Sequence, residues 1–388
     1  MLCKIILQVS NNFILLGKIK LYSENLKESF KVKAHNKESI GIAFAYTGVI
    51  VGAGFSTGQE LLQFFTNFGL WSIPGVILTA IIVIFVGRQV SKVGYRLDTE
   101  SYEVSLVNIF GNKLGTIIDY ILIFFLYGLS VIMIAGAGSA FQDGFGIEPW
   151  LGSLIMTIAV FITLLLNFDN IMKALGSITP FLIVLVLIIA GYHIINPTIP
   201  FSEVNEYRQI DRTPTGLWWW DAITYAGLDM ATVFSFLTIV GSGASSHKVA
   251  RRGPLIGGII IIVLMLLINV GMLVNLKESN EYGLPTLLLA EQIHPILGFC
   301  MAIIMMLVIY NTIVGLMYPF LTRFTKAYSK KYLMLLIVGL LFGYGLSFVG
   351  FVDLVNFFYP IFGYIGIVIS IALFIRWIMN KFTKKKLV

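Results

Sequence analysis

The chain has 388 residues and a formal net charge of +7, with 57% hydrophobic residues, 12% charged residues and a mean hydropathy of +0.89. This composition excludes a soluble globular domain and indicates a polytopic membrane protein. The two cysteines and four histidines are scattered without the spacing of metal ligands or of a disulfide framework, so we expect neither.

Residues 1–38 form a polar, basic stretch that differs from the rest of the chain. Its one apolar segment, residues 5–16, is interrupted by Gln8, Asn11 and Asn12 and is too short to cross a bilayer. We expect a flexible cytoplasmic extension without a cleavable signal peptide. The transmembrane domain is expected to occupy residues 39–388 and to end in a short basic tail.

Ten apolar segments follow, each close to the roughly 20 residues that a membrane-spanning helix needs. The predicted spans are 40–66, 72–94, 114–141, 149–167, 171–194, 217–243, 253–275, 294–320, 332–351 and 353–377. Two shorter amphipathic segments, residues 101–111 and 284–294, lie between spans and are expected to rest at the membrane surface.

The basic residues orient these spans. With both termini cytoplasmic, all but three of the 27 lysines and arginines fall in inner segments, the exceptions being Arg208, Arg212 and Lys277. Such asymmetry is the positive-inside pattern of a multi-pass plasma-membrane protein. The net charge therefore reflects topology and contact with the lipid bilayer, and gives no reason to expect nucleic-acid binding.

The first span has a centre that is unfavourable for a continuous helix. Gly52, Ala53 and Gly54 stand at membrane depth and are followed by a polar run from Ser56 to Glu60. Glycine in a helix interior costs about 1 kcal/mol relative to alanine, and freed backbone groups in a membrane need partners inside the protein. The pattern predicts a helix broken around a polar ligand, with close helix packing as the alternative.

The sixth span carries a second polar centre. Gly227 and Asp229 fall near its middle, where an unpaired carboxylate costs at least about 2.5 kcal/mol. We predict a second helix break here, the alternative being an aspartate that is satisfied by a neighbouring helix. Asp119, nearer the end of the third span, is expected to be solvated or to cap its helix.

The spacing of the two centres predicts an inverted repeat of five spans each, residues 39–194 and 217–377. In such folds broken helices meet at the midplane and form the substrate site between them. Half-helix N-termini suit a carboxylate and freed carbonyls suit an ammonium group, so a zwitterionic amino acid satisfies both. Asn311 and Thr312 in the eighth span are neutral oxygen donors suited to a monovalent cation, or polar contacts between helices. Glu60 is expected to line the outer path or to respond to protons.

These motifs resemble known transporters. Gly52-Ala53-Gly54-Phe55 and the polar run through Glu60 resemble the first broken helix of the amino acid–polyamine–organocation superfamily, which has the LeuT fold. The run from Val51 to Glu60 resembles the bacterial YkvI-type membrane proteins more closely. Two further runs, Gly136–Gln142 and Pro285–Ala290, fit the same family.

The resemblance implies a set of site residues. The amides of Gly52, Ala53 and Gly54 would hold a substrate carboxylate. Carbonyls of the sixth-span break, beside Asp229, would hold the amine, and they belong to Tyr225, Ala226, Gly227 and Leu228. One Na+ site would combine the carbonyls of Gly48 and Val51 with the side chains of Asn311 and Thr312. Two adjacent hydroxyl residues are more usual where Asn311 and Thr312 stand, and Phe55 disfavours a second Na+ site. Proton coupling through Asp229 or Glu60 therefore stays open.

The sequence thus predicts an all-α, LeuT-like secondary transporter that works by alternating access. The expected substrate is a small zwitterionic solute, above all an amino acid, and the expected coupling ion is Na+ or H+ rather than any resident cofactor. Motifs of enzymes and primary pumps are missing from the sequence. The alternative is a transporter-like sensor that binds a solute and signals through a partner. Substrate identity and oligomeric state are not indicated.

Overall fold

The structure, a computed structural model, describes residues 34–51, 53–99, 101–349 and 351–382. All regular secondary structure within these ranges is helical. A helix over residues 34–50 opens the described chain. It is followed by α2 (Ala53–Thr57), α3 (Gln59–Phe64), the 3-10 helix η1 (Thr66–Trp71), α4 (Ser72–Leu97), α5 (Tyr102–Phe110), α6 (Asn112–Phe145), α7 (Pro149–Leu164) and α8 (Phe168–Ile195).

The second half follows after a loop with two short 3-10 helices, η2 (Val204–Glu206) and η3 (Ile210–Arg212). Its elements are α9 (Trp218–Ser242), α10 (His247–Leu273), α11 (Leu276–Ser279), α12 (Pro285–Ile293), α13 (Pro295–Phe324), α14 (Lys330–Leu346), the 3-10 helix η4 (Ser347–Val349) and α15 (Phe351–Phe382).

Each predicted span coincides with a helix or, for the first span, with an interrupted set of helices. Eight helical segments of the described residues are long and apolar enough to cross a membrane, and α7 is a shorter apolar helix. The amphipathic segments 101–111 and 284–294 correspond to α5 and α12. The prediction of an all-α membrane protein is confirmed.

The ends of these helices follow local sequence signals. Proline stands at the start of α7, α12 and α13, where its missing N–H costs nothing. The side chains of Asn167, Ser246 and Ser329 cap α8, α10 and α14 by accepting hydrogen bonds from backbone amides. Gly146 ends α6 with a positive φ of 67°, a conformation that favours glycine.

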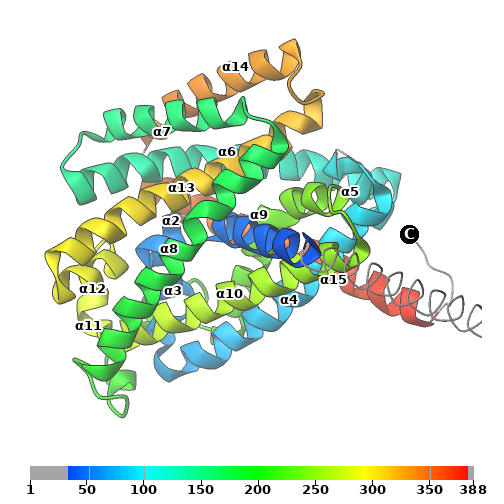
Figure 1. Cartoon of the computed structure of the whole chain (residues 1–388). Helices are drawn as coiled ribbons and strands as arrows, with labels where there is room; N and C mark the ends of the chain where they lie inside the picture. The colour runs from blue at the N-terminus through cyan, green and yellow to red at the C-terminus, as the bar shows by residue number, and fades with distance from the viewer. Residues whose placement is uncertain (1–33, 52, 100, 350, 383–388) are drawn as a thin grey trace, which may run out of the picture.

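Helix α9 forms the centre of the bundle. In its most apolar stretch 94% of the residues are buried, against 28–56% in the other candidate spans. It packs extensively against α4, α15 and α13, and Figure 1 shows it between the α6, α7 and α14 side of the molecule and the α4 and α10 side. A polar group on α9 therefore faces protein rather than lipid.

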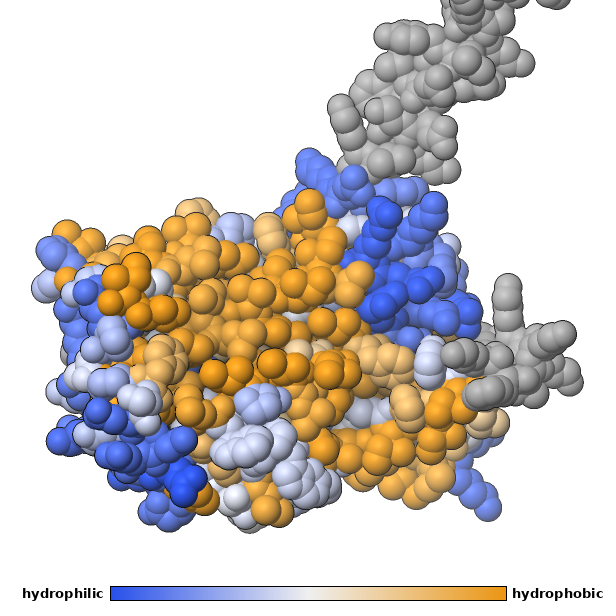
Figure 2. Space-filling view, turned by 90° about the horizontal axis from the view of Figure 1, so that it is seen from below, coloured by the Kyte–Doolittle hydropathy of each residue, from blue (hydrophilic) through white to orange (hydrophobic). Residues whose placement is uncertain are grey.

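The outer surface is apolar where the helices are exposed. Large exposed side chains such as Ile81, Phe124, Phe181 and Leu341 belong to different spans. The face in Figure 2 shows a broad hydrophobic band between hydrophilic ends. This band is the surface expected of a multi-pass membrane protein.

The first helix begins earlier than predicted. Residues 34–38 are already helical and continue into the first span, so the predicted boundary between residues 38 and 39 falls inside a helix. Residues 1–33, most of the predicted extension, lie outside the described residues.

One end of the bundle carries most of the basic side chains, and we call it the basic end. Here α4, α13 and α15 finish and α10 begins, with Arg96, Arg323, Arg376 and Arg251 among its residues. Under the positive-inside prediction this is the cytoplasmic side.

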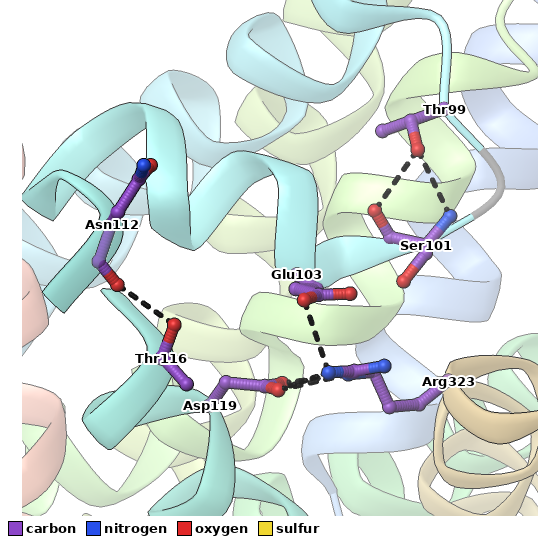
Figure 3. A network of polar contacts seen from close by, with 7 residues as sticks. All are labelled: Thr99, Ser101, Glu103, Asn112, Thr116, Asp119 and Arg323. Carbon is purple, nitrogen blue, oxygen red and sulfur yellow. Dashed lines mark hydrogen bonds and ion pairs between the residues drawn. The ribbon is translucent and has the colours of Figure 1, made fainter. Parts of the chain in front are cut away.

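A buried ion pair holds α5 and α6 to α13 at the basic end (Figure 3). Arg323 Nε lies 3.0 and 2.9 Å from the two carboxylate oxygens of Asp119, and its Nη2 lies 2.6 Å from Asp119 Oδ2. The same Nη2 lies 3.1 Å from Glu103 of α5. The Asp119 side chain is fully buried. The expectation that Asp119 is solvated or caps its helix is therefore wrong, because Arg323 supplies its counter-charge from 204 residues away.

Candidate functional site

The first span is interrupted twice. Its first helix ends at residue 50, Val51 departs from it, and Gly52 lies outside the described residues before Ala53 and Gly54 begin α2. A second interruption follows at Gly58, whose φ is 87° and where a Cβ atom would lie 2.9 Å from Met272 Sδ. The predicted break in the first span is thus present, extended by a turn that requires glycine.

The residues that follow this interruption are bound to the segment that carries α12. The hydroxyl of Thr286 donates to the carbonyl of Ser56 in α2. Gln59 Nε2 donates to the carbonyls of Gly283, at 2.7 Å, and Tyr282, at 3.2 Å. The Ser56 carbonyl, next to the interruption, therefore has a partner inside the protein, as a membrane interior demands.

A cluster of buried acids and tyrosines lies beside the interruption. Tyr225 Oη donates to Glu60 Oε2 at 3.0 Å, joining α9 to α3. Asp229 stands one helical turn along α9 from Tyr225, within electrostatic range of Glu60 and of Tyr46 on the first helix. Tyr359 of α15 lies within electrostatic range of both acids. We call these five residues, contributed by four different elements, the acid–tyrosine cluster.

Two polar atoms of the cluster lack hydrogen-bond partners in the part of the chain that the structure describes. The exposed fractions are 8% for Glu60, 5% for Asp229, 3% for Tyr359 and zero for Tyr46. Within the described residues, Asp229 Oδ2 and the Tyr46 hydroxyl are buried without a hydrogen bond. Burying such groups costs about 1–3 kcal/mol each, and more when they are charged. Such atoms are places where a bound water, an ion or a ligand can supply the missing hydrogen bond.

The prediction of a helix break in the sixth span is wrong. Helix α9 runs without interruption from Trp218 to Ser242, so the carbonyls from Tyr225 to Leu228 lie inside a continuous helix. Gly227 has a different role, because a Cβ atom there would lie 2.2 Å from the carbonyl oxygen of Gly363. A Cβ on Gly366 would lie 1.6 Å from the Gly227 carbonyl oxygen. These glycines let α9 and α15 approach closely, which is the packing use of small residues in membranes.

The eighth-span residues Asn311 and Thr312 lie at the junction of α13 with the first helix and α8. Thr312 Oγ1 donates to the Val49 carbonyl at 3.0 Å. Asn311 Nδ2 donates to Leu175 O of α8 at 2.8 Å, and a Cβ on Gly48 would lie 2.6 Å from that nitrogen. Asn311 Oδ1 is buried without a partner in the described part of the chain. The carbonyl that Thr312 contacts is that of Val49, not those of Gly48 or Val51.

The structure thus brings the predicted residues into two groups. Glu60 and Asp229 meet in the acid–tyrosine cluster, while Gly48 and Asn311 meet at the junction of the first helix with α8 and α13. Sequence reasoning missed Tyr46 and Tyr359. One sequence signal could have indicated these two tyrosines. Both stand within predicted spans, whereas tyrosines of membrane proteins are usually found at the membrane interfaces.

Two curated proteins of Bacillus subtilis (strain 168) are similar in sequence. The uncharacterized membrane protein YkvI is 26% identical over 330 residues, which cover 84% of this chain and 92% of that protein. The uncharacterized protein YyaD is 24% identical over 334 residues, covering 86% and 95%. No family model matches the chain.

Solved structures share the fold. MhsT in complex with L-phenylalanine has a TM-score of 0.69 at 15% identity, covering 87% of this chain and 89% of that one. A Na+-coupled sialic acid symporter has a TM-score of 0.63 at 15% identity, covering 87% and 79%. A manganese transporter of Eremococcus coleocola has a TM-score of 0.52 at 12% identity, covering 89% and 88%. The LeuT-like fold expected from the sequence is confirmed, and membership of the amino acid–polyamine–organocation superfamily stays a prediction.

Proposed function

We propose that this protein is a secondary transporter that carries a small solute with a protonated amino group, above all an amino acid, by alternating access. The observation that carries the proposal is the acid–tyrosine cluster, which is buried at the centre of a membrane-spanning bundle. Ionisable residues at such depth mark substrate and ion pathways. MhsT binds L-phenylalanine in its structure, and the second neighbour is a symporter of sialic acid, so both bind small organic molecules, in keeping with this class.

The cluster favours a cationic group on the solute. Glu60 and Asp229 are both acids, and no ion pair joins either of them to a basic side chain in the described residues. Because α9 is continuous, its carbonyls do not supply the amine site that the sequence suggested. In our proposal the Asp229 carboxylate holds the amine, and the hydroxyls of Tyr46 and Tyr359 add hydrogen bonds.

The carboxylate of the solute would be held at the interruption of the first span. Backbone amides at the start of a short helix attract anions, and Ala53 and Gly54 begin α2 near Glu60. Gly52, the remaining residue of this predicted set, lies outside the described residues. An interruption of this kind also supplies the hinge that alternating access needs.

The two ends of the first span differ in how closely they are packed. At the basic end a cavity of about 640 Å³ lies between the first helix, α8 and the end of α9, with Gly41, Phe44 and Gly243 in its lining. On the opposite side the hydrogen bonds of Thr286 and Gln59 close the segment before α12 over the interruption. This asymmetry supports an inward-facing state in our proposal.

The coupling ion is proposed to be Na+ or H+. For Na+, Asn311 Oδ1 has no hydrogen-bond partner among the described residues and Thr312 contacts the first helix, which supports a site at the junction of the first helix with α8 and α13. For H+, Glu60 and Asp229 offer two carboxylates that exchange protons in the same cluster.

Uptake of a labelled amino acid mixture into proteoliposomes tests the proposal, with one arm under a Na+ gradient and one under a proton gradient. We expect accumulation under one gradient, and its loss in Asp229→Asn with normal insertion into the membrane. Asp221→Asn is the matched control, because Asp221 lies on the same helix but accepts its hydrogen bonds from Thr215 at the outer end. Equal uptake by wild type and Asp229→Asn would refute the role of the cluster.

A further inference from the structure

A column of basic residues lies on one face of α4. Arg88, Lys92 and Arg96 recur every four residues, and this spacing places them one above another on a helix. Towards the middle of the bundle the same face continues with Ile81 and Ile77, whose exposed fractions are 63% and 47%. Since exposed isoleucines on a membrane span face lipid, the basic column lies on the lipid-facing side of α4 at the basic end.

No residue of the column forms an ion pair with a carboxylate among the described residues. Lys92 lies within electrostatic range of Arg88, Arg96 and also Arg251 at the start of α10. No ion pair with a carboxylate involves any of these four in the part of the chain that the structure describes. Arg88 Nε is buried and has no hydrogen-bond partner there. Like charges four residues apart on a helix repel each other, so an anion at this place would stabilise the fold.

Aromatic rings flank the column on the side of α15. The ring of Phe85, one turn before Arg88, lies 5.8 Å from that of Phe374 and 5.4 Å from that of Trp377. Arg376, beside Trp377, donates to the carbonyl and side-chain oxygens of Asn108 and lies within electrostatic range of Arg96. An apolar surface therefore leads directly into the basic one, as a molecule with an acyl chain and an anionic head requires.

We propose that the seam formed by α4, the start of α10 and the end of α15 binds an anionic phospholipid in the leaflet at the basic end. Its phosphate lies on Arg88, Lys92 and Arg96, with Arg251 beside them, and an acyl chain lies along Phe85 and Ile81. Basic pockets between membrane helices bind acidic lipid headgroups in this way. The occupant is a lipid rather than a soluble anion because the column continues the lipid-facing stripe of α4.

Native mass spectrometry of the purified full chain with phosphatidylglycerol and phosphatidylcholine tests this site. The test variant is Arg88→Gln/Lys92→Gln/Arg96→Gln. The matched control, Lys326→Gln/Lys330→Gln/Lys331→Gln, removes the same charge from exposed lysines around the start of α14. We expect the test variant to bind phosphatidylglycerol about tenfold or more weakly, since each basic residue near an anionic leaflet contributes about fivefold. The control variant and phosphatidylcholine binding should be unchanged.

Three results would overturn the assignment. The first is equal phosphatidylglycerol binding by the test variant and the control. The second is equal affinity of the unmodified protein for the two lipids, a comparison that decides the matter even if the test variant does not fold. The third is displacement of phosphatidylglycerol by glycerol phosphate, which would make the column a site for soluble anions.

Discussion

The ion pair between Asp119 and Arg323 gives the sharpest stability prediction. Three N–H···O contacts of 2.6 to 3.0 Å join the two side chains, and the Asp119 side chain has no exposed surface. Replacing Arg323 with glutamine leaves a buried carboxylate without its counter-charge. Removing one partner of a buried pair costs roughly 3–5 kcal/mol. We expect about 3 kcal/mol here, because 20% of the Arg323 side chain is exposed and water can partly replace it.

The measurement is the free energy of unfolding of the purified protein in detergent. Variants of the other two residues of this ion-pair network serve as controls. Glu103→Gln removes the second, 36% exposed partner of Arg323 and should cost less than about 1 kcal/mol. The double variant Arg323→Gln/Asp119→Asn leaves no buried charge and should be more stable than Arg323→Gln alone. The reasoning fails if Arg323→Gln and Glu103→Gln destabilise equally.

Three further substitutions follow from the same geometry. Gly58→Ala should lower the stability of the protein by more than Gly111→Ala. Both glycines have a positive φ, but of the two only Gly58 has neighbours within 4 Å of an added Cβ. The midpoints of thermal unfolding of the two variants test this difference. Gly366→Ala should destabilise strongly by forcing α15 away from α9, whereas Gly345→Ala, with open space around it, should be neutral or slightly stabilising. Thr312→Val should remove the hydrogen bond to the first helix and lower the free energy of unfolding by about 1 kcal/mol. It should also weaken any stimulation of uptake by Na+. Stimulation equal to that of the wild type would count against a Na+ site at this residue.

Much of the fold was predictable because the hydrocarbon core of a membrane restricts which secondary structures a chain can adopt. A helix satisfies its own backbone in a bilayer, so the apolar segments of the sequence became helical in order, and eight helical segments of the described residues are long and apolar enough to cross a membrane. The interruption of the first span was also predictable, because two glycines followed by a polar run at membrane depth disfavour a continuous helix. The same reasoning found Glu60 and Asp229, because an intramembrane carboxylate is rare without a use.

The sixth span shows where such reasoning ends. A glycine beside an aspartate is compatible with a helix break and with close packing, and the choice depends on the neighbouring helix. Gly227 faces Gly363 and Gly366 of α15, which lie more than 130 residues away in the chain. Tyr359 of the cluster and Arg323, the partner of Asp119, are equally remote contacts. Sequence patterns within one span carry no information about such partners.

Counterflow tests the central claim most directly. Proteoliposomes preloaded with unlabelled amino acids are diluted into a trace of the same labelled amino acids, without an imposed ion gradient. For a carrier that alternates access we expect a transient accumulation of label that is lost in Asp229→Asn and kept in Asp221→Asn. Folded protein that shows no accumulation would contradict the transport proposal and favour a solute sensor instead.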